Sequence, residues 1–166
     1  MSTVQNQPDA ILPFALAGQP LLLAIHTTAD AGALCKIDFV SGRAALSPRN
    51  ALAEKVAQQL EVYLDDPQHP FDLPLQMQGT EFQCRLWSAL TAVPTGKTET
   101  YGQLAHRLSS GAQAVGQACR RNPVPIVVPC HRILAQSGIG GYVGETAGEK
   151  ISAKQALLAH EGVVCG

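Results

Sequence analysis

Short apolar runs alternate with turn-forming residues in the first forty positions of the chain. Residues 11–40 contain three such runs, which are separated by Gly18-Gln19-Pro20 and by the segment Thr-Thr-Ala-Asp-Ala-Gly. Apolar runs of this length between turn residues are typical of β-strands that are joined by tight turns. The pattern therefore predicts a small antiparallel sheet.

A helical pattern follows the predicted sheet. Leu52, Val56, Leu60 and Tyr63 recur at intervals of three or four residues, which places them on one face of a helix. We expect an amphipathic helix over residues 51–64, packed on the sheet through this face.

A segment rich in proline and polar side chains, residues 65–79, predicts a linker between two halves. We expect an α/β N-terminal domain over residues 1–75 and a mostly α-helical C-terminal domain over residues 76–166. A chain of 166 residues is long enough for one compact domain or for two small domains that share an interface.

Two capping-box patterns mark helix starts in the second half. The pairs Thr80/Gln83 and Thr100/Gln103 have the spacing at which each end of a pair can hydrogen-bond the backbone of the other. They predict two helices in succession. The first should bury Phe82, Leu86, Trp87 and Leu90.

A third helix is predicted over residues 112–121, after a three-residue break at 109–111. Two short helices joined in this way have helix-turn-helix spacing. The third helix is built largely from glycine and alanine, so another backbone can approach it closely. This suits either tight packing within the protein or insertion into a DNA groove.

Cys130, His131 and Arg132 follow one another directly. The β-branched run at 124–128 predicts a strand that ends at Pro129, so the cysteine would lie at a strand exit. A free cysteine is most often a small buried hydrophobe. Here its two polar neighbours are unsuited to a dry core, and their positive potential favours a thiolate. Adjacent residues in an extended chain point apart, so activation by the histidine implies a bridging water.

Composition narrows the class of protein. Hydrophobic residues make up 46% of the chain, as in a globular protein. Five cysteines without a Cys-x-x-Cys pair disfavour a disulfide framework and a zinc ribbon, so we expect a cytoplasmic protein without a structural metal. The first basic residue is Lys36, and the apolar stretch before it is broken by prolines, which disfavours a signal peptide or a membrane span.

Charge is distributed unevenly along the chain. Residues 1–75 contain four basic and eight acidic side chains, a net charge of −4, whereas residues 76–166 contain eight and five, a net charge of +3. The sum is the overall charge of −1. The C-terminal half is therefore the candidate to face an anionic partner.

Five segments of the second half resemble the O6-alkylguanine-DNA alkyltransferases, DNA repair proteins that react once. They are GTEFQCRLW, TYGQLA, AVGQACRRNPVPIVVPCHRI, GGY and KQALLAHEG, in this order between residues 79 and 163. The resemblance implies an α/β domain followed by a helical domain with a helix-turn-helix. It also implies a monomer that binds double-stranded DNA through the minor groove and needs no cofactor.

The resemblance further implies a reaction. The alkyl group on guanine O6, mainly methyl, would move to Cys130, leaving S-alkylcysteine and an inactivated protein. In-line attack by a thiolate requires a lowered thiol pKa and hydrogen bonding to the departing oxygen.

Catalytic roles in the family would fall on five residues. Cys130 would be the nucleophile, His131 the base that takes its proton through a water, and Glu161 the carboxylate that orients the imidazole. Asn122 would tie the helix-turn-helix to the site by hydrogen bonds. Tyr101 would help to turn the target nucleotide out of the duplex and would donate towards the guanine.

Two further sets of residues follow from the resemblance. The DNA-binding set is Ala112, Gln113, Ala114, Gly116, Thr80 and Arg120. The pocket set is Ile133, Tyr142, Val143 and Gly144, in which main-chain groups would read the extruded base. Gln113 stands where the family normally has an intercalating arginine, and its amide is shorter and uncharged.

Two alternatives differ in class. One is a non-catalytic protein that only binds alkylated DNA, but such relatives replace the acceptor cysteine that this chain retains at Cys130. The other is a thiol hydrolase or redox enzyme, which would need a histidine remote in sequence or a second, resolving cysteine. The sequence shows a motif for neither.

Overall fold

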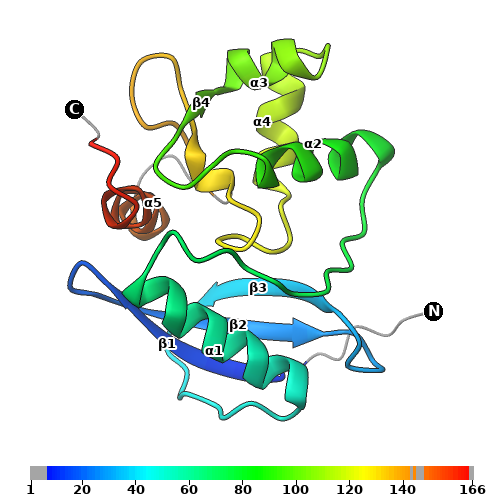
Figure 1. The fold of residues 1–166 in the computed structure, drawn as a ribbon, viewed down its shortest axis with the longest axis vertical. Coiled ribbons are helices and arrows are strands. Elements are labelled where there is room, and N and C mark those ends of the chain that lie inside the picture. Colours follow the sequence, from blue (N-terminus) through cyan, green and yellow to red (C-terminus); the bar gives the residue numbers. More distant parts are fainter. Residues whose placement is uncertain (1–6, 143, 145–147, 165–166) are drawn as a thin grey trace. The chain divides into compact units, whose positions relative to one another are not determined.

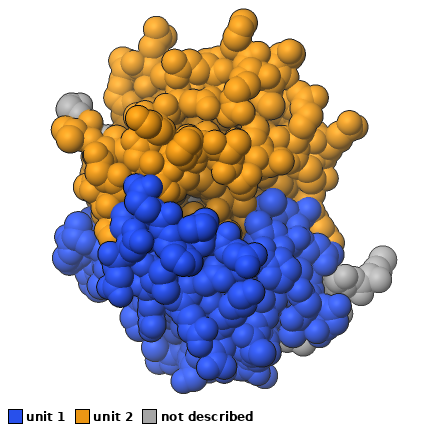
Figure 2. Space-filling model, in the orientation of Figure 1, with its two compact units in different colours: residues 1–77 blue, residues 78–166 orange. Residues whose placement is uncertain are grey.

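The computed structural model describes residues 7–142, 144 and 148–164. The chain forms two compact units, residues 1–77 and residues 78–166 (Figure 2). None of the helices in the described part of the chain has the length and apolar character needed to cross a bilayer.

The first unit contains a three-stranded antiparallel sheet (Figure 1). Strands β1 (Ala10–Leu16), β2 (Gln19–Thr27) and β3 (Leu34–Val40) lie side by side in sequence order. Ala17 and Gly18 join the first two strands with φ angles of 49° and 77°. Two consecutive positive φ angles give a turn whose twist matches that of the strands. The predicted sheet is confirmed.

Helix α1 (Ala51–Asp65) packs against β1 and β2 of this sheet (Figure 1). Its N-terminus is capped by Asn50, whose side-chain oxygen accepts a hydrogen bond from the Ala53 N–H at 2.7 Å. Its buried residues are Ala53, Val56, Leu60 and Tyr63. The helix predicted for this segment is confirmed, together with the face that it buries.

The chain after α1 packs back onto the first unit instead of running free. The Leu34 N–H donates to Pro74 O at 2.8 Å, and the Gln76 N–H donates to Leu34 O at 3.0 Å. The rings of Tyr63 and Phe71 stack with their centroids 5.5 Å apart. Much of the segment predicted as a linker therefore belongs to the packing of the first unit.

The second unit is mostly helical, in agreement with the predicted fold class. Its elements are α2 (Glu81–Thr91), β4 (Glu99–Thr100), α3 (Tyr101–Arg107), α4 (Ala112–Arg120), the 3-10 turn η1 (Cys130–Arg132), β5 (Ile133–Leu134) and α5 (Glu149–His160). Strands β4 and β5 pair in parallel. Both capping boxes are present, at Thr80 and at Thr100, which confirms the predicted starts of α2 and α3.

Helix α4 is anchored on α2 by one long side chain. The indole Nε1 of Trp87 donates to Ala118 O at 3.0 Å, and both residues are buried. Leu86 and Leu90 are also buried as predicted, whereas Phe82 is half-buried and lies under the guanidinium of Arg85. The orientation of α4 is thus set by its contacts with α2.

Helices α3 and α4 lie next to each other and are joined by a short reversal of the chain (Figure 1). Ser109 has a φ of 53°, and the Ser110 N–H donates to Ala105 O at 2.8 Å. This hydrogen-bond pattern ends a helix through a left-handed residue. The two helices and the break predicted between them are confirmed.

The strand predicted over residues 124–128 is wrong. The Val128 N–H donates to Val124 O at 2.9 Å, and Ile126 has a φ of 76°, so the segment is a tight turn. Prolines within and after the run cannot donate to a strand ladder, and a β-branched residue at positive φ interrupts extended pairing. Cys130, His131 and Arg132 therefore form a 3-10 turn and do not lie at a strand exit.

Candidate active site

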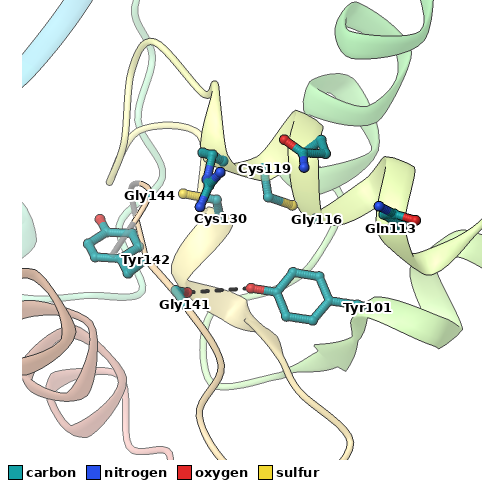
Figure 3. Close-up of a pocket in the computed structure, with 10 residues that line it drawn as sticks. Tyr101, Gln113, Gly116, Cys119, Cys130, Gly141, Tyr142 and Gly144 are labelled. Carbon is teal, nitrogen blue, oxygen red and sulfur yellow. Dashed lines mark hydrogen bonds between the residues drawn. The ribbon is translucent and has the colours of Figure 1, made fainter. Parts of the chain in front are cut away.

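A cavity of about 210 Å³ in the second unit is lined by α3, α4, η1 and the chain after β5 (Figure 3). It contains two of the predicted catalytic residues, Tyr101 and Cys130. From the predicted DNA-binding and pocket sets it contains Gln113, Gly116, Arg120, Tyr142 and Gly144. The structure also places Gln117, Cys119 and Gly141 in its wall, none of which was predicted.

The thiol of Cys130 is held in a protonated state in the resting protein. The residue is 5% exposed, and this burial raises the pKa of its thiol to about 11, against the opposing effects of Asn122 and of the charge on Lys154. The expected lowered pKa is therefore not found, because desolvation outweighs the neighbouring positive potential. Nucleophilic attack consequently requires a base that removes the proton during the reaction.

Asn122 fixes the turn that leads to Cys130. Its Nδ2 donates to Val128 O at 2.8 Å, and its Oδ1 accepts from the Val124 N–H at 3.0 Å. The side chain is buried directly after the C-terminus of α4. It lies between the helix-turn-helix and the segment that carries Cys130, where the family resemblance expects a tie between them.

His131 and Glu161 form a fully buried pair next to the cavity. Nε2 of the histidine lies 2.8 Å from Oε2 of the glutamate. Burial lowers the pKa of His131, although the glutamate acts to raise it, so the imidazole is neutral. A carboxylate only accepts hydrogen bonds, which assigns the ring proton to Nε2 and leaves Nδ1 as the basic nitrogen. That Nδ1 is buried and hydrogen-bonds to no other described residue.

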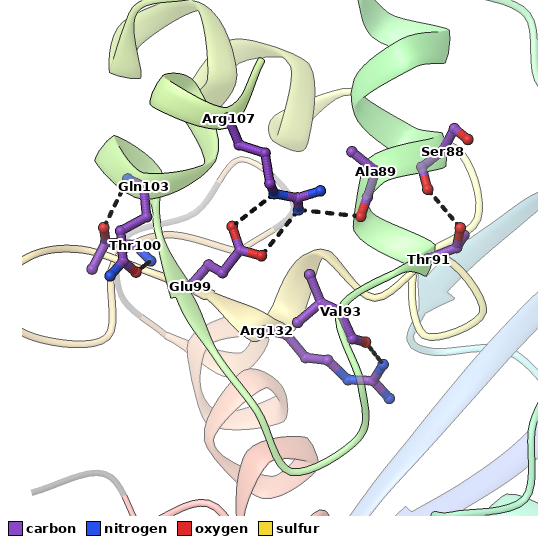
Figure 4. A network of polar contacts seen from close by, with 9 residues as sticks. All are labelled: Ser88, Ala89, Thr91, Val93, Glu99, Thr100, Gln103, Arg107 and Arg132. Atoms are coloured by element: carbon purple, nitrogen blue, oxygen red, sulfur yellow. Dashed lines mark hydrogen bonds and ion pairs between the residues drawn. The ribbon is translucent and has the colours of Figure 1, made fainter. Parts of the chain in front are cut away.

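Arg132 holds the carboxylate of Glu161 from the other side. Its Nε donates to Oε1 at 2.8 Å, and its Nη2 donates to Oε2 at 3.1 Å. The same guanidinium donates to Val93 O at 2.7 Å (Figure 4) and to the Thr95 hydroxyl at 3.0 Å. Bidentate pairing of this kind fixes a carboxylate in orientation as well as in position. The sequence interpretation credited Arg132 only with positive potential and missed this role.

Tyr101 lies at the first position of α3 and faces the cavity (Figure 3). Its hydroxyl donates to Gly141 O at 3.4 Å. Burial raises the pKa of the phenol to about 12, so it stays protonated and can act as a hydrogen-bond donor at neutral pH.

Ala118 of α4 is buried, but the other small residues of this helix lie on its outer face. Ala112, Gln113 and Ala114 are exposed, and a Cβ atom added to Gly116 would have no other atom within 4 Å. These positions therefore do not serve tight packing within the protein, whereas the buried Ala118, on the side of the helix that faces Trp87, fits that interpretation. They leave a smooth backbone surface to which a partner can come close.

An ion pair reinforces the arrangement of α3 with β4 and α2. Arg107 donates to both carboxylate oxygens of Glu99, at 3.0 and 3.4 Å, and to Ala89 O at 3.4 Å (Figure 4). The pair joins the last turn of α3 to β4 and to α2. It is partly exposed, so we assign it a role in orientation and not a large contribution to stability.

Comparison with known proteins identifies the family. The family model of the 6-O-methylguanine DNA methyltransferase DNA-binding domain matches residues 81–163. A methylated-DNA–protein-cysteine methyltransferase from Methanosarcina acetivorans is 34% identical over 152 residues, which cover 86% of this chain and 92% of the relative. The chain belongs to the 6-O-methylguanine DNA methyltransferase family.

Other members of the methyltransferase family agree in sequence and in structure. The constitutive methylated-DNA–protein-cysteine methyltransferase of Bacillus subtilis is 40% identical over 109 residues, 64% of each chain. The O6-methylguanine methyltransferase of Mycobacterium tuberculosis superimposes with a TM-score of 0.68 at 33% identity over 86% of both chains. A structure of OGT from the same organism in complex with DNA gives a TM-score of 0.67 at the same identity and coverage.

Several predicted residues of this methyltransferase lie outside the cavity wall. Thr80 is exposed and caps α2, with its hydroxyl accepting from the Gln83 N–H at 3.1 Å. Ile133 is fully buried in β5, and its carbonyl accepts a hydrogen bond from Lys154. Val143 lies outside the described residues.

Two buried groups of the methyltransferase were missed by the sequence interpretation. Cys119, on the inner face of α4, shares the cavity with Cys130, and burial raises the pKa of its thiol to about 12. Lys154, on α5, is fully buried, a rare position for a lysine. The described residues contain no group of three or more His, Cys, Asp or Glu side chains placed to hold a metal ion.

Proposed function

We propose that Cys130 is the alkyl acceptor of this DNA repair methyltransferase. The protein would take the O6-alkyl group of guanine in DNA, mainly methyl, in a single turnover that leaves S-alkylcysteine. The observation that carries the proposal is a buried thiol in the wall of a cavity, next in sequence to a histidine that a carboxylate orients. Relatives that are 34% and 40% identical to this chain are named methylated-DNA–protein-cysteine methyltransferases.

His131 is the base in this proposal. Its Nδ1 is the unprotonated nitrogen, because Nε2 donates to Glu161. No hydrogen bond joins the Cys130 thiol to the imidazole among the described residues, so the proton passes through one bridging water. A neutral histidine can accept this proton at neutral pH, and the imidazolium that forms is stabilised by Glu161.

The displacement step conserves atoms and electrons. The electron pair of the Cys130 sulfur forms a bond to the alkyl carbon, and the carbon–oxygen bond breaks with its electron pair on the guanine. The guanine then takes up one proton and the thiol has lost one, so the reaction has no net change in protons. Tyr101, whose phenol is protonated, donates a hydrogen bond to the guanine and stabilises the anion that forms on it.

DNA would approach the exposed face of α4. Its small side chains allow a close approach of the backbone to the minor groove, and the cavity opens beside the same helix. The target nucleotide would turn out of the duplex into this cavity, because the alkyl carbon cannot be reached inside the base stack. Gln113 lines the cavity near the start of α4, and in this proposal its side chain would fill the vacated stack.

Mass spectrometry tests the acceptor. After incubation with a duplex that contains O6-methylguanine, we expect one added methyl group per protein molecule, on the peptide that contains Cys130. Cys130→Ser should bind the same duplex and gain no methyl group, since a hydroxyl is a far weaker nucleophile at its free pKa. Repeated turnover, or a methyl group on Cys35, Cys84 or Cys119, would overturn the assignment.

We also propose a cytoplasmic location and a monomeric state. Cys35, Cys84, Cys119 and Cys130 are free thiols, which suits a reducing compartment. Fractionation of the cells that produce the protein and light scattering of the purified chain test the two statements separately.

A further inference from the structure

Cys119 is a second thiol in the wall of the cavity that holds Cys130. It lies in the last turn of α4 and is buried, and the two cysteines line the cavity together (Figure 3). Of the described residues that form this wall, they are the only two that carry a thiol. The proposed methyl transfer uses Cys130 and leaves Cys119 without a chemical role.

Asn122 contacts the segments that carry both cysteines. Its backbone N–H donates to Cys119 O at 3.2 Å, and its Nδ2 donates to Val128 O at 2.8 Å, two residues before Cys130. Burial raises the pKa of Cys130, and a hydrogen bond from the Asn122 side chain acts in the opposite direction. One buried asparagine therefore ties the end of α4 to η1 and fixes both thiols in the cavity wall.

The two thiols are close enough to influence each other's ionisation. Burial raises the pKa of Cys119 to about 12, and a negative charge on Cys130 also acts to raise it. Both cysteines are free thiols. A disulfide would hold their sulfur atoms about 2 Å apart, whereas a two-carbon linker holds them roughly twice as far apart. A two-carbon linker therefore demands less movement of the wall than a direct sulfur–sulfur bond.

A 2-haloethyl group on guanine O6 would bring two reactive carbons into this cavity. The Cys130 sulfur forms a bond to the carbon next to O6, and the carbon–oxygen bond breaks with its electron pair on the guanine, as for a methyl group. The second carbon still carries the halogen. The sulfur lone pair then displaces halide and closes a three-membered thiiranium ring, which makes the alkylated Cys130 an electrophile. A methyl group has no second carbon, so its transfer stops at the first step.

Cys119 can open the thiiranium ring. Its sulfur forms a bond to a ring carbon, and the broken carbon–sulfur bond leaves its electron pair on the Cys130 sulfur. One thiol proton is taken up by the guanine and the other leaves with the halide, so the two cysteines lose two hydrogens and gain C₂H₄. Alkylation also removes the negative charge of Cys130 that acts to raise the pKa of Cys119. The positive ring that replaces this charge favours the Cys119 thiolate.

Water and DNA are the competing nucleophiles. Water would leave an S-hydroxyethyl group on Cys130, and a DNA base would leave the protein covalently attached to the duplex. A nucleophile that is held in the same cavity acts at an effective concentration that free nucleophiles do not reach. Because Cys119 lies in the wall beside Cys130, it has this advantage over both competitors.

We propose that Cys119 is a second nucleophile of this cavity: it captures a 2-haloethyl group that Cys130 has removed from guanine, and the reaction ends in a two-carbon thioether bridge between the two cysteines. The proposal rests on the proposed function, in which Cys130 is the acceptor. It adds a class of substrate, O6-(2-haloethyl)guanine in DNA. It also adds an activity, the capture of a bifunctional alkyl group without attachment of the protein to DNA.

The test uses two sources of the two-carbon group. One is a duplex with freshly prepared O6-(2-chloroethyl)guanine, and the other is 1-bromo-2-chloroethane added to the protein without DNA. Trypsin separates the two cysteines into peptides 108–120 and 122–132, so mass spectrometry detects a bridge as these two peptides joined through C₂H₄. Cys119→Ser and Cys119→Ala are compared with the parent. Cys84→Ser is the matched control, because it removes an exposed thiol from the same unit.

We expect the bridge to be the main product of the parent with both sources, about tenfold above the S-hydroxyethyl form. Cys119→Ser and Cys119→Ala should lose the bridge, and hydroxyethylated Cys130 and DNA-bound protein should increase by about the same factor. Cys84→Ser should match the parent. Methyl transfer by each Cys119 variant is measured alongside and used to normalise the yields, so that a loss of folded protein is not mistaken for a loss of capture.

The products of the parent decide the question even if neither Cys119 variant folds. A parent that carries only S-hydroxyethyl on Cys130, or a bridge from Cys130 to His131 or Tyr101, would overturn the proposal. If the duplexes transfer no alkyl group to Cys130 while 1-bromo-2-chloroethane gives the bridge, the proposed function fails and Cys119 is still the second nucleophile. If Cys130 is methylated by an O6-methylguanine duplex and neither two-carbon source gives the bridge, the proposed function holds and the role of Cys119 is refuted.

Discussion

The carboxylate of Glu161 lies 2.8 Å from the imidazole Nε2 of His131, and both side chains are fully buried although thirty residues separate them in sequence. Arg132, the next residue after the histidine, holds the same carboxylate through two hydrogen bonds. The orientation of the imidazole is therefore set by a glutamate that is itself held in place. This arrangement leads to the first of four predictions.

Glu161→Gln should slow methyl transfer by about 10- to 100-fold, because the amide no longer stabilises the imidazolium or selects the ring tautomer. DNA affinity should be unchanged, because Glu161 is buried and the surface proposed to bind DNA is the exposed face of α4. Single-turnover rates between about pH 6 and 9 measure the effect. Glu149→Gln, at an exposed position on the same helix, is the control. Parental rates in Glu161→Gln throughout this range would exclude the proposed role of the pair.

Ala114→Glu should weaken DNA binding by placing bulk and negative charge on the exposed face of α4. Reaction with free O6-benzylguanine should change little, because the free base makes no groove contact. Gly116→Ala is a milder companion: its Cβ would meet open space in the protein, so the helix should be stabilised by about 0.5–1 kcal/mol while DNA affinity falls. Binding titrations and the free-base assay separate these effects, and equal losses in both assays would indicate misfolding instead.

Gln113→Arg should strengthen DNA binding and speed the repair of duplex substrate. An arginine fills a vacated base stack better than glutamine, and one added phosphate contact steepens the salt dependence by a slope of about −0.9. Gln113→Ala should slow duplex repair more than single-stranded repair, because a single strand has no base pair to break. The measurement is the single-turnover rate on matched duplex and single-stranded oligonucleotides. Equal duplex rates for Gln113→Ala and the parent would show that this side chain does not hold the stack open.

Stability of the second unit should fall at both ends of the pH range. Burial lowers the pKa of His131 below its ordinary value of 6.5, so below about pH 6.5 the unfolded chain binds a proton that the folded chain does not. The free energy of unfolding is then lost as the pH falls. Burial raises the pKa of Cys130 from 9.0 to about 11, so between these values the unfolded chain loses its proton first and stability falls as the pH rises.

Urea unfolding followed by tryptophan fluorescence measures this dependence. Trp87 is the one tryptophan of the chain and is buried in the second unit, so the signal reports on that unit. Cys130→Ser should reduce the loss of unfolding free energy at alkaline pH by about 3 kcal/mol. Cys119 retains its own contribution, because burial raises the pKa of its thiol to about 12. If the free energy of unfolding fell equally with rising pH in Cys130→Ser and in the parent, burial would not raise the pKa of the Cys130 thiol as described.

Local signals in the sequence predicted most of the secondary structure. The capping boxes at Thr80 and Thr100 place the starts of two helices because their hydrogen bonds join residues three apart. The positions of apolar residues also located α1 and the three strands. Such a pattern depends only on residues that are close in sequence within a single helix or strand. The strand predicted over residues 124–128 was wrong for a reason that is also local. The apolar, β-branched residues favoured a strand, but the prolines and the positive φ of Ile126 give a turn.

The sequence was sufficient to predict the family and to single out Cys130, His131 and Glu161 as candidate site residues, because these residues stand in short motifs of a recognisable order. It could not predict that Arg132 binds Glu161 or that Lys154 binds the Ile133 carbonyl, since each contact joins segments that only the packed second unit brings together. The protonation state of the thiol was also decided by the tertiary structure. Adjacent basic residues favour a thiolate, but the folded chain removes Cys130 from water, and the cost of burying its charge is larger.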